Sequence, residues 1–489
     1  MLFNSHIFML LFLPLLLAGW YFLNWKKKFQ LAQGYLIGMS LWFYAYANLQ
    51  YLWLLLFSCL IGWLLSCLPE KIFSEKGKKV LTGVGCVFHL GLLGYFKYSN
   101  FFLENLNTVF HTDFPMLQIL LPVGISFYTF QQLAYLIDRC RGDAPRDSFF
   151  DYLTFMVYFP QLLQGPILLR SEFMGQLKEP ERRRFHAERF SEGIQFFVFG
   201  LAKKVLLADT LAKAVNYGYS NVSMLDSISA LLLAVGYLTE LYFDFSGYCD
   251  MAVGLGKMIG LEVAENFDAP FHSASVKEFW RRWHMTLGRF FTRYVYIPLG
   301  GNRRGKMRTL CNVMIVMLLS GLWHGAAWTF VLWGFLHGVG MIWDNLEHPH
   351  LPKKWMRQAA TFAYVCMTFV FFRAESIAQG IDVLKSIVSL KWNGFVFQMA
   401  SALDMTECYI ITKALSMKLP GLLSWFWLGI FVVLIAICFR VLSGEKVSGV
   451  VALQRQKGYG RLYPVLLAVL FTWSIISMTG VSEYLYFSF

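Results

Sequence analysis

Apolar stretches recur along the whole chain, and they constrain the fold more than any single motif does. A helix needs about 20 apolar residues to cross roughly 30 Å of hydrocarbon. Of the 489 residues, 57% are hydrophobic and 15% are charged, which leaves too few charges to cover a soluble protein of this size. Windows that meet or nearly meet the required length lie at residues 7–24, 31–48, 50–68, 80–98, 117–137, 190–207, 228–246, 310–328, 329–346, 358–372, 422–441 and 462–480. The sequence predicts an all-α, polytopic membrane protein with roughly 11–13 transmembrane helices plus re-entrant segments.

Positive charge predicts how the chain is oriented, because Lys and Arg collect in loops that stay in the cytoplasm. No Lys or Arg precedes Lys26, so we expect the N-terminus outside. The basic clusters that contain Arg139 and Arg182 flank one apolar stretch, residues 149–169, so both of its ends would be cytoplasmic. Two prolines within the stretch also break a helix. We therefore expect residues 149–169 to be re-entrant and sheltered inside the protein.

Two histidines are the strongest candidates for chemistry. His284 lies in the densest basic region, residues 277–308, which predicts that it lies at or near the cytoplasmic face. His324 lies in the apolar window 310–328, where about thirteen helical residues counted from Cys311 place it roughly 20 Å higher. Ionisable groups in hydrocarbon are costly and usually functional. If both histidines face one cavity, they mark a path from the cytoplasm into the membrane.

Charge and cysteine content narrow the classes of partner. The net charge of +13 is explained by cytoplasmic loops and their attraction to anionic membrane lipids, without a nucleic-acid partner. A basic cavity mouth would also attract a polyanion such as the phosphate end of coenzyme A. The nine cysteines stand singly, without metal-ligand spacing, and no phosphate-binding loop is present. The sequence predicts no metal site and no ATP-driven chemistry.

Four ordered motifs carry a family resemblance: Phe159–Pro166, Tyr242–Gly254, Phe279–His284, and Leu322–Phe330 with Trp333-Gly334 and His337-Gly338. In this order they resemble the membrane-bound O-acyltransferase family. Within that family the chain looks most like the bacterial alginate O-acetyltransferase (AlgI-like) branch, down to Phe371–Ala374 and the aromatic C-terminus Tyr484–Phe489. The resemblance covers nearly the whole chain. It implies one integral-membrane domain over residues 1–489, with a core at about 100–375 and additional spans at about 420–480.

The resemblance also implies an activity. Helices would surround a funnel in which acetyl-CoA, the donor substrate, is presented from the cytoplasm, with no bound cofactor. The acetyl group would pass to a hydroxyl of an extracytoplasmic polysaccharide such as alginate, or of peptidoglycan, directly or through an extracytoplasmic SGNH-type acetyltransferase partner. The location implied is the bacterial cytoplasmic membrane. His324 matches the family's catalytic histidine, and His284 matches the second histidine of the bacterial branch.

The chemistry of the residues supports these roles. A hydroxyl that attacks a thioester must lose its proton, and a neutral imidazole accepts a proton near pH 7. Burial disfavours the charged imidazolium, which would keep His324 neutral. His284 could be a second base, orient the donor or hold the acceptor. Its neighbours Arg281 and Arg282 could bind the phosphates of the donor.

Further donor-binding or tunnel candidates are Trp283, Trp323, Gln161, Asp244 and Asp250. Gln161 lies between two prolines and could line the tunnel or bond broken backbone. Asp244 and Asp250 could shape the cavity, or cap a helix that starts after Ser246.

On the helix that follows His324, Gly334 and Gly338 indicate close helix packing, and we interpret His337 between them as a packing residue.

Two alternatives stay open at this point. D-alanyl transfer from a carrier protein to teichoic acid uses related motifs, although the proteins that perform it are usually shorter. A histidine-lined channel or carrier would need no covalent chemistry, although no internal repeat typical of many transporters is visible.

Overall fold

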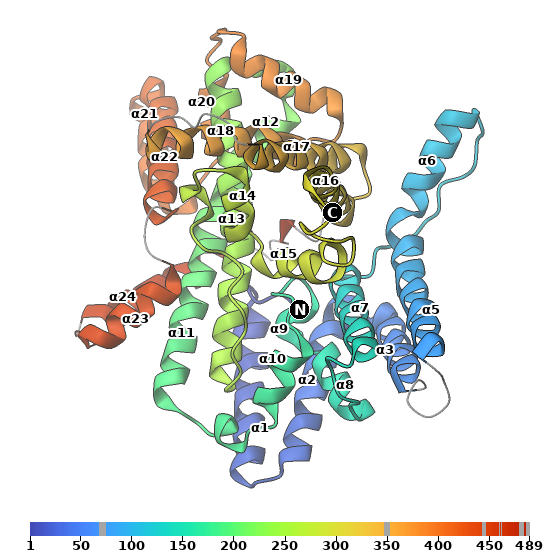
Figure 1. Cartoon of the computed structure of the whole chain (residues 1–489). Helices are drawn as coiled ribbons and strands as arrows, with labels where there is room; N and C mark the ends of the chain where they lie inside the picture. The colour runs from blue at the N-terminus through green and yellow to red at the C-terminus, as the bar shows by residue number, and fades with distance from the viewer. Residues whose placement is uncertain are drawn as a thin grey trace. The chain divides into compact units, whose positions relative to one another are not determined.

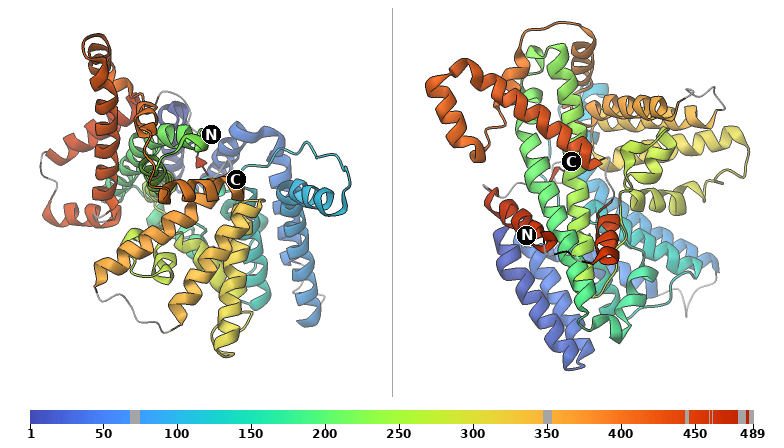
Figure 2. Two further views of the ribbon diagram at one scale, coloured as in Figure 1. Left: turned by 90° about the horizontal axis from the view of Figure 1, so that it is seen from above. Right: turned by 90° about the vertical axis from the view of Figure 1, so that its left-hand side faces the viewer.

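The computed structural model describes residues 1–67, 75–346, 353–442, 446–458, 460, 462–478 and 484–485. Helices are the regular elements of this part of the chain, and it contains no strand (Figures 1 and 2). They form two compact units. Unit 1 comprises Met1–Phe197, Cys249–Glu265 and Arg289–Val295, and unit 2 comprises Val198–Tyr248, Asn266–Gly288 and Tyr296–Phe489. The predicted all-α class is confirmed.

Six helical stretches among the described residues are long and apolar enough to cross a membrane. They are Phe8–Trp25, Leu49–Cys67, Lys76–Phe110, Ser227–Met258, Lys306–His324 and Pro420–Val441. Each overlaps a predicted window, so the chain is polytopic. The total of roughly 11–13 spans stays a prediction.

Unit 1 begins with two helices that are joined by a short loop and pack against each other. Its elements are η1 (Phe8–Phe12), α1 (Leu13–Trp25), α2 (Phe29–Asn48), η2 (Leu49–Tyr51), α3 (Leu52–Cys67), α5 (Glu75–Leu93), η3 (Gly94–Tyr98), α6 (Ser99–Phe110), α7 (Ile125–Arg141), α8 (Phe149–Met156), α9 (Phe159–Leu162), α10 (Arg170–Leu177), η4 (Pro180–Arg183) and the first part of α11 (Ala187–Ala202). Its core is aromatic: the rings of Phe8, Phe12, Phe43 and Phe159 lie within 6.3 Å of one another.

The predicted re-entrant stretch is broken and buried. It contains the short helices α8 and α9, and residues 163–169 follow without a helix, although most of the stretch is buried. Ser148 caps α8 by accepting the backbone N–H of Asp151. The side-chain amide of Gln161 donates to the carbonyl oxygen of Phe155, which satisfies backbone freed by the break.

One predicted window is partly wrong. Residues 112–124 form no helix, and α7 begins at Ile125 rather than near 117. Pro115 and Pro122 disfavour helix in this segment. Gly124 then turns the chain with φ +78°, and a Cβ there would collide with the carbonyl oxygen of Leu162.

Unit 2 holds most of α13 (Ser227–Met258) and the hairpin that carries His324. Its elements are η5 (Lys203–Ala208), α12 (Asp209–Ser220), η6 (Val222–Met224), α13 (Ser227–Met258, which ends in unit 1), η7 (Pro270–His272), α14 (Val276–Arg282), the start of α15 (Met285–Phe291, which ends in unit 1 and is followed there by η8, Thr292–Tyr296), α16 (Lys306–His324), α17 (Trp328–Asn345), α18 (Lys354–Arg373), α19 (Ile377–Val388), α20 (Phe395–Ser401), η9 (Thr406–Cys408), α21 (Tyr409–Lys418), α22 (Pro420–Leu442), α23 (Val447–Lys457) and α24 (Leu462–Ile476).

Helices α16 and α17 form an antiparallel hairpin around a turn at residues 325–327 (Figures 1 and 2). Their backbones touch at two glycines. A Cβ on Gly321 would collide with the carbonyl oxygen of Phe330, and one on Gly334 with that of Met317. A Cβ on Gly338 would press on the sulfur of Met314. The predicted close packing at Gly334 and Gly338 is confirmed.

A buried ion pair joins η5, a π-helical turn, to α13. The Nζ of Lys204 lies 2.7 Å from Oδ1 of Asp244 and 2.8 Å from Oδ1 of Asp209. The other oxygen of Asp244 accepts the backbone N–H of Leu485 at 3.1 Å. Lys204 also lies 4.6 Å from the ring centre of Tyr484. Helix α13 runs without interruption through this region, so the suggested helix start after Ser246 is wrong.

Replacing Gly334 with Ala is expected to destabilise the protein by about 1–3 kcal/mol, because the new methyl group meets backbone that cannot move aside cheaply. Thermal unfolding of the detergent-solubilised protein measures this. Gly429→Ala in α22 is the matched control, since a Cβ there meets no atom within 4 Å. Equal melting temperatures for the two variants would contradict the close contact between α16 and α17.

Replacing Lys204 with Met is expected to cost about 3–5 kcal/mol, because Asp244 is left as a buried, unpaired charge. Asp244→Asn should cost less, since Lys204 keeps Asp209 as a partner. Combining the two substitutions should recover part of the loss caused by Lys204→Met. The measurement is the yield and melting temperature of folded protein, and an additive double variant would argue against the pair.

Candidate active site

His324 is the last residue of α16, at the hairpin turn, and its side chain is buried. The helix ends here because Gly325 takes an extended conformation, where a Cβ would collide with the ring of Phe330. The Nδ1 atom of His324 lies 2.6 Å from the carbonyl oxygen of Ser320, one turn earlier. A carbonyl oxygen can only accept, so Nδ1 carries the hydrogen and Nε2 is the basic nitrogen of the neutral ring.

His284 lies between α14 and α15 and is only 1% exposed. Its backbone φ is +46°, in the left-handed region that His tolerates better than most residues. The Nδ1 atom lies 3.2 Å from Oδ1 of Asn266. Burial first, and the nearby His324 second, lower the pKa of His284 well below its usual value. His284 is therefore neutral near pH 7.

The two imidazole rings lie together, with centres 6.3 Å apart. The prediction that His284 stays at the cytoplasmic mouth, with His324 roughly 20 Å higher, is therefore wrong. The reason is α14, which packs along α17. The backbone N–H of Lys277, at its start, donates to Asp344 near the end of α17, whereas the Trp280 ring, one turn on, packs on Trp333. Helix α14 thus carries His284 along the hairpin toward its turn.

Aromatic rings enclose the histidine pair. The ring of His324 packs on Trp333 at 5.0 Å and on Phe372 at 5.4 Å. The ring of His284 packs on Phe245 at 4.8 Å and on Trp323 at 6.0 Å. All of these residues belong to unit 2. Such walls exclude water and strengthen electrostatic interactions between groups inside.

His337 is held by two hydrogen bonds. Trp280 donates its indole N–H to Nδ1 of His337 at 3.2 Å, so Nε2 must carry the hydrogen. That nitrogen lies 2.9 Å from the hydroxyl oxygen of Thr368, which in turn donates to the carbonyl oxygen of Val365 at 2.8 Å. Both ring nitrogens are engaged in structure, which supports the interpretation of His337 as a packing residue.

The residues that flank His284 have different environments. Trp283 is 1% exposed and packs on Phe267 and Phe369, so it is part of the aromatic core. Arg282 forms an ion pair with Glu278 at 2.9 Å. Arg281 is exposed. Arg281 is therefore the more exposed of the two arginines.

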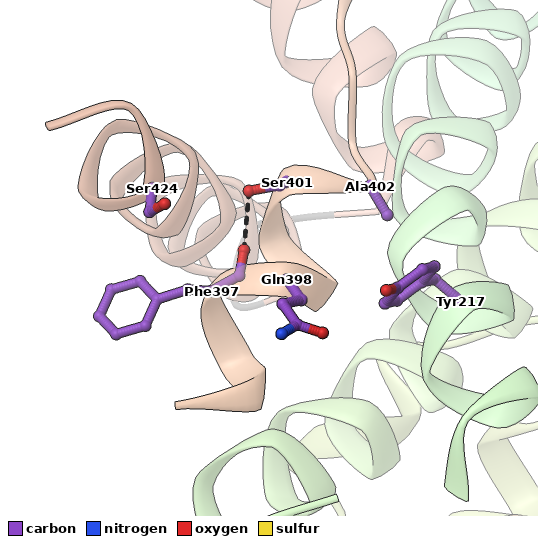
Figure 3. A pocket seen from close by; sticks show the side chains of 6 residues that line it. All are labelled: Tyr217, Phe397, Gln398, Ser401, Ala402 and Ser424. Carbon is purple, nitrogen blue, oxygen red and sulfur yellow. Dashed lines mark hydrogen bonds between the residues drawn. The ribbon is translucent and has the colours of Figure 1, made fainter. Parts of the chain in front are cut away.

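Three predicted site residues remain. Asp244 belongs to the Lys204 ion pair in unit 2, whereas Gln161 and the half-buried Asp250 belong to unit 1. A hollow of about 380 Å³ in unit 2 contains none of the predicted site residues (Figure 3). It is lined by Tyr217, Phe397, Gln398, Ser401, Ala402 and Ser424.

Sequence reasoning missed Asn266, Thr286, Phe245 and the carbonyl of Ser320. Ser320 had a signal, since it stands one helical turn before His324. Asn266 had none, because it is 18 residues from His284 and the chain between them turns through two short helices.

Comparison with known proteins supplies the family. The membrane-bound O-acyltransferase family matches residues 141–380. The chain is 35% identical over 423 residues to the peptidoglycan O-acetyltransferase of Helicobacter pylori, which covers 80% of each protein. It is 39% identical over 389 residues to the probable alginate O-acetylase of Azotobacter vinelandii, covering 77% of this chain and 76% of the relative. It is 28% identical over 271 residues to the teichoic acid D-alanyltransferase of Bacillus subtilis, covering 52% of this chain and 69% of the relative. The chain therefore belongs to the membrane-bound O-acyltransferase family and is a multi-pass membrane O-acyltransferase.

Proposed function

We propose that this protein moves an acetyl group from cytoplasmic acetyl-CoA across the bacterial cytoplasmic membrane to a hydroxyl of an extracytoplasmic polysaccharide. The observation that carries the proposal is the buried pair of histidines, with ring centres 6.3 Å apart inside aromatic walls. Relatives named as peptidoglycan O-acetyltransferase and alginate O-acetylase support both the acetyl group and the glycan acceptor.

His324 is the general base in this proposal. The hydroxyl oxygen of the acceptor attacks the thioester carbonyl carbon while Nε2 of His324 takes the hydroxyl proton. The C–O bond forms, the C–S bond breaks, and the thiolate of coenzyme A leaves with the proton that the imidazolium returns. The hydrogen bond from Nδ1 to the Ser320 carbonyl holds the ring and stabilises the positive charge while it exists.

Basic residues indicate which side the donor uses. Lys306 and Arg308 begin α16, and Lys354 and Arg357 begin α18, so these helix ends are assigned to the cytoplasm. The same rule places the N-terminus outside. The segment with α19, α20 and α21 then lies outside, where an SGNH-type acetyltransferase partner would receive the acetyl group for the final glycan.

The two alternatives fit less well. Membership of an O-acyltransferase family favours covalent chemistry over a channel. D-alanyl transfer is represented among the relatives at 28% identity over about half of this chain. The acetyltransferase relatives match at 35% and 39% over more than three quarters of it.

His324→Ala is expected to lower acetyl transfer by roughly 100- to 10,000-fold, the usual contribution of a general base. The assay follows labelled acetyl from acetyl-CoA into acceptor glycan, together with the release of free CoA. His186→Ala is the control, because His186 is an exposed histidine.

Wild-type rates in His324→Ala would contradict the assignment of the base. If the wild-type protein accepts an acyl group only from a D-alanyl carrier protein and not from acetyl-CoA, its reaction is D-alanyl transfer and the proposed acetyl transfer is wrong.

Arg281→Gln is expected to raise the KM for acetyl-CoA by about tenfold with kcat little changed, because a charge-assisted hydrogen bond to phosphate is lost. Arg282→Gln should raise it less, since Arg282 is already paired with Glu278. Steady-state kinetics at low and high salt measure both effects. If Arg281→Gln leaves KM unchanged at low salt, Arg281 does not bind the donor.

A further inference from the structure

We propose that Asn266 is a positioning residue for acyl transfer: its side-chain oxygen holds the His284 imidazole in one tautomer and one orientation. The inference rests on the proposed function, in which His284 is the partner of the catalytic histidine. Asn266 lies in the link between α13 and α14. It acts through His284.

The orientation of the Asn266 amide follows from its partners. The backbone N–H of Thr286 lies 3.0 Å from one side-chain atom of Asn266, and an N–H can meet only an acceptor there. That atom is therefore the oxygen, Oδ1. The hydroxyl of Thr286 also lies 3.0 Å from it and donates to it. The assignment of oxygen and nitrogen is thus fixed by a main-chain donor.

The tautomer of His284 follows from that oxygen. Nδ1 of His284 lies 3.2 Å from Oδ1, which can only accept, so Nδ1 carries the hydrogen. Nε2 is then the basic nitrogen of the neutral ring. His324 reaches the same tautomer through a different acceptor, the Ser320 carbonyl. Both histidines of the pair present Nε2 as the proton acceptor.

The backbone holds Asn266 against His284. The carbonyl oxygen of Asn266 accepts the N–H of Met285 at 3.0 Å, and the N–H of Asp268 donates to the carbonyl oxygen of Arg282 at 2.8 Å. These two bonds bracket His284. Asn266 is 1% exposed, so water does not replace its oxygen. The left-handed conformation of His284 is kept by this frame.

Two substitutions separate positioning from simple structural support. Asn266→Ala removes the acceptor and leaves a buried Nδ1–H without it, which is expected to lower kcat by about 10- to 100-fold. Asn266→Asp keeps an acceptor for all three donors and adds negative charge beside His284. The charge favours the imidazolium, so the acid limb of the pH–kcat profile should move up by about 1 pH unit. Thr286→Val removes the threonine hydroxyl that donates to the same oxygen. The acid limb of its pH–kcat profile should stay at the wild-type position.

Nitrogen NMR reports the tautomer without any need for activity. In protein labelled with ¹⁵N-histidine, the His284 resonances are identified by their absence from His284→Asn, a substitution that tolerates the left-handed backbone. The wild type should show a protonated Nδ1 and an unprotonated Nε2 at neutral pH. In Asn266→Ala the two tautomers should mix.

The proposal is overturned by an unprotonated Nδ1 in the wild type, or by a wild-type tautomer and kcat in Asn266→Ala. It is also overturned if both Asn266 variants lose activity only in proportion to folded protein, with an unshifted pH profile. If the wild type transfers no acetyl at all, the proposed function fails, and the NMR arm alone still decides whether Asn266 orients His284.

Discussion

The contact of backbone on backbone between α16 and α17 is the constraint on which the site depends. Gly321 and Gly334 let the two helices touch without side chains between them. This closeness brings Trp333 onto the ring of His324. Helix α14 then packs along α17 and delivers His284 to the same place. One hairpin thus sets the spacing of both histidines, although they stand 40 positions apart in the sequence.

Proton positions are fixed around this hairpin by groups that have only one hydrogen-bonding role. A carbonyl oxygen at Ser320 and an amide oxygen at Asn266 can only accept, and the indole of Trp280 can only donate. Each of them determines which nitrogen of its histidine carries the hydrogen. In an interior with few competing waters, groups that can only accept or only donate are strong determinants of the histidine tautomer. Both nitrogens of His337 are engaged with side chains of the packing core.

The fold class and the two histidines were predictable from local sequence, whereas their arrangement was not. Apolar length predicted the six helical stretches that are long enough to cross a membrane, and two prolines predicted the broken stretch that contains Gln161. The basic residues near His284 led to the wrong prediction that this histidine lies at the membrane surface. A count of charges along the chain carries no information on how the short helix α14 packs along α17. Asn266 was missed for a related reason: its contact with His284 arises from a loop that folds back, which no periodicity encodes. The aromatic C-terminus was predicted as a motif; Tyr484 and Leu485 contact the Lys204 ion pair, and residues 486–489 lie outside the described part of the chain.

The π-helical turn η5 has a consequence for how insertions and deletions are tolerated. A π-turn holds one residue more than the α-helical turn it replaces. Loss of one residue between Lys203 and Ala208 would let α11 and α12 join as one continuous α-helix. Everything beyond the deletion would rotate by about 100°. Asp209 would turn away from Lys204, and the ion pair that Lys204 forms with α13 would lose its second carboxylate. Homologous chains that are shorter by one residue here are therefore expected to pair the lysine at position 204 with one carboxylate instead of two.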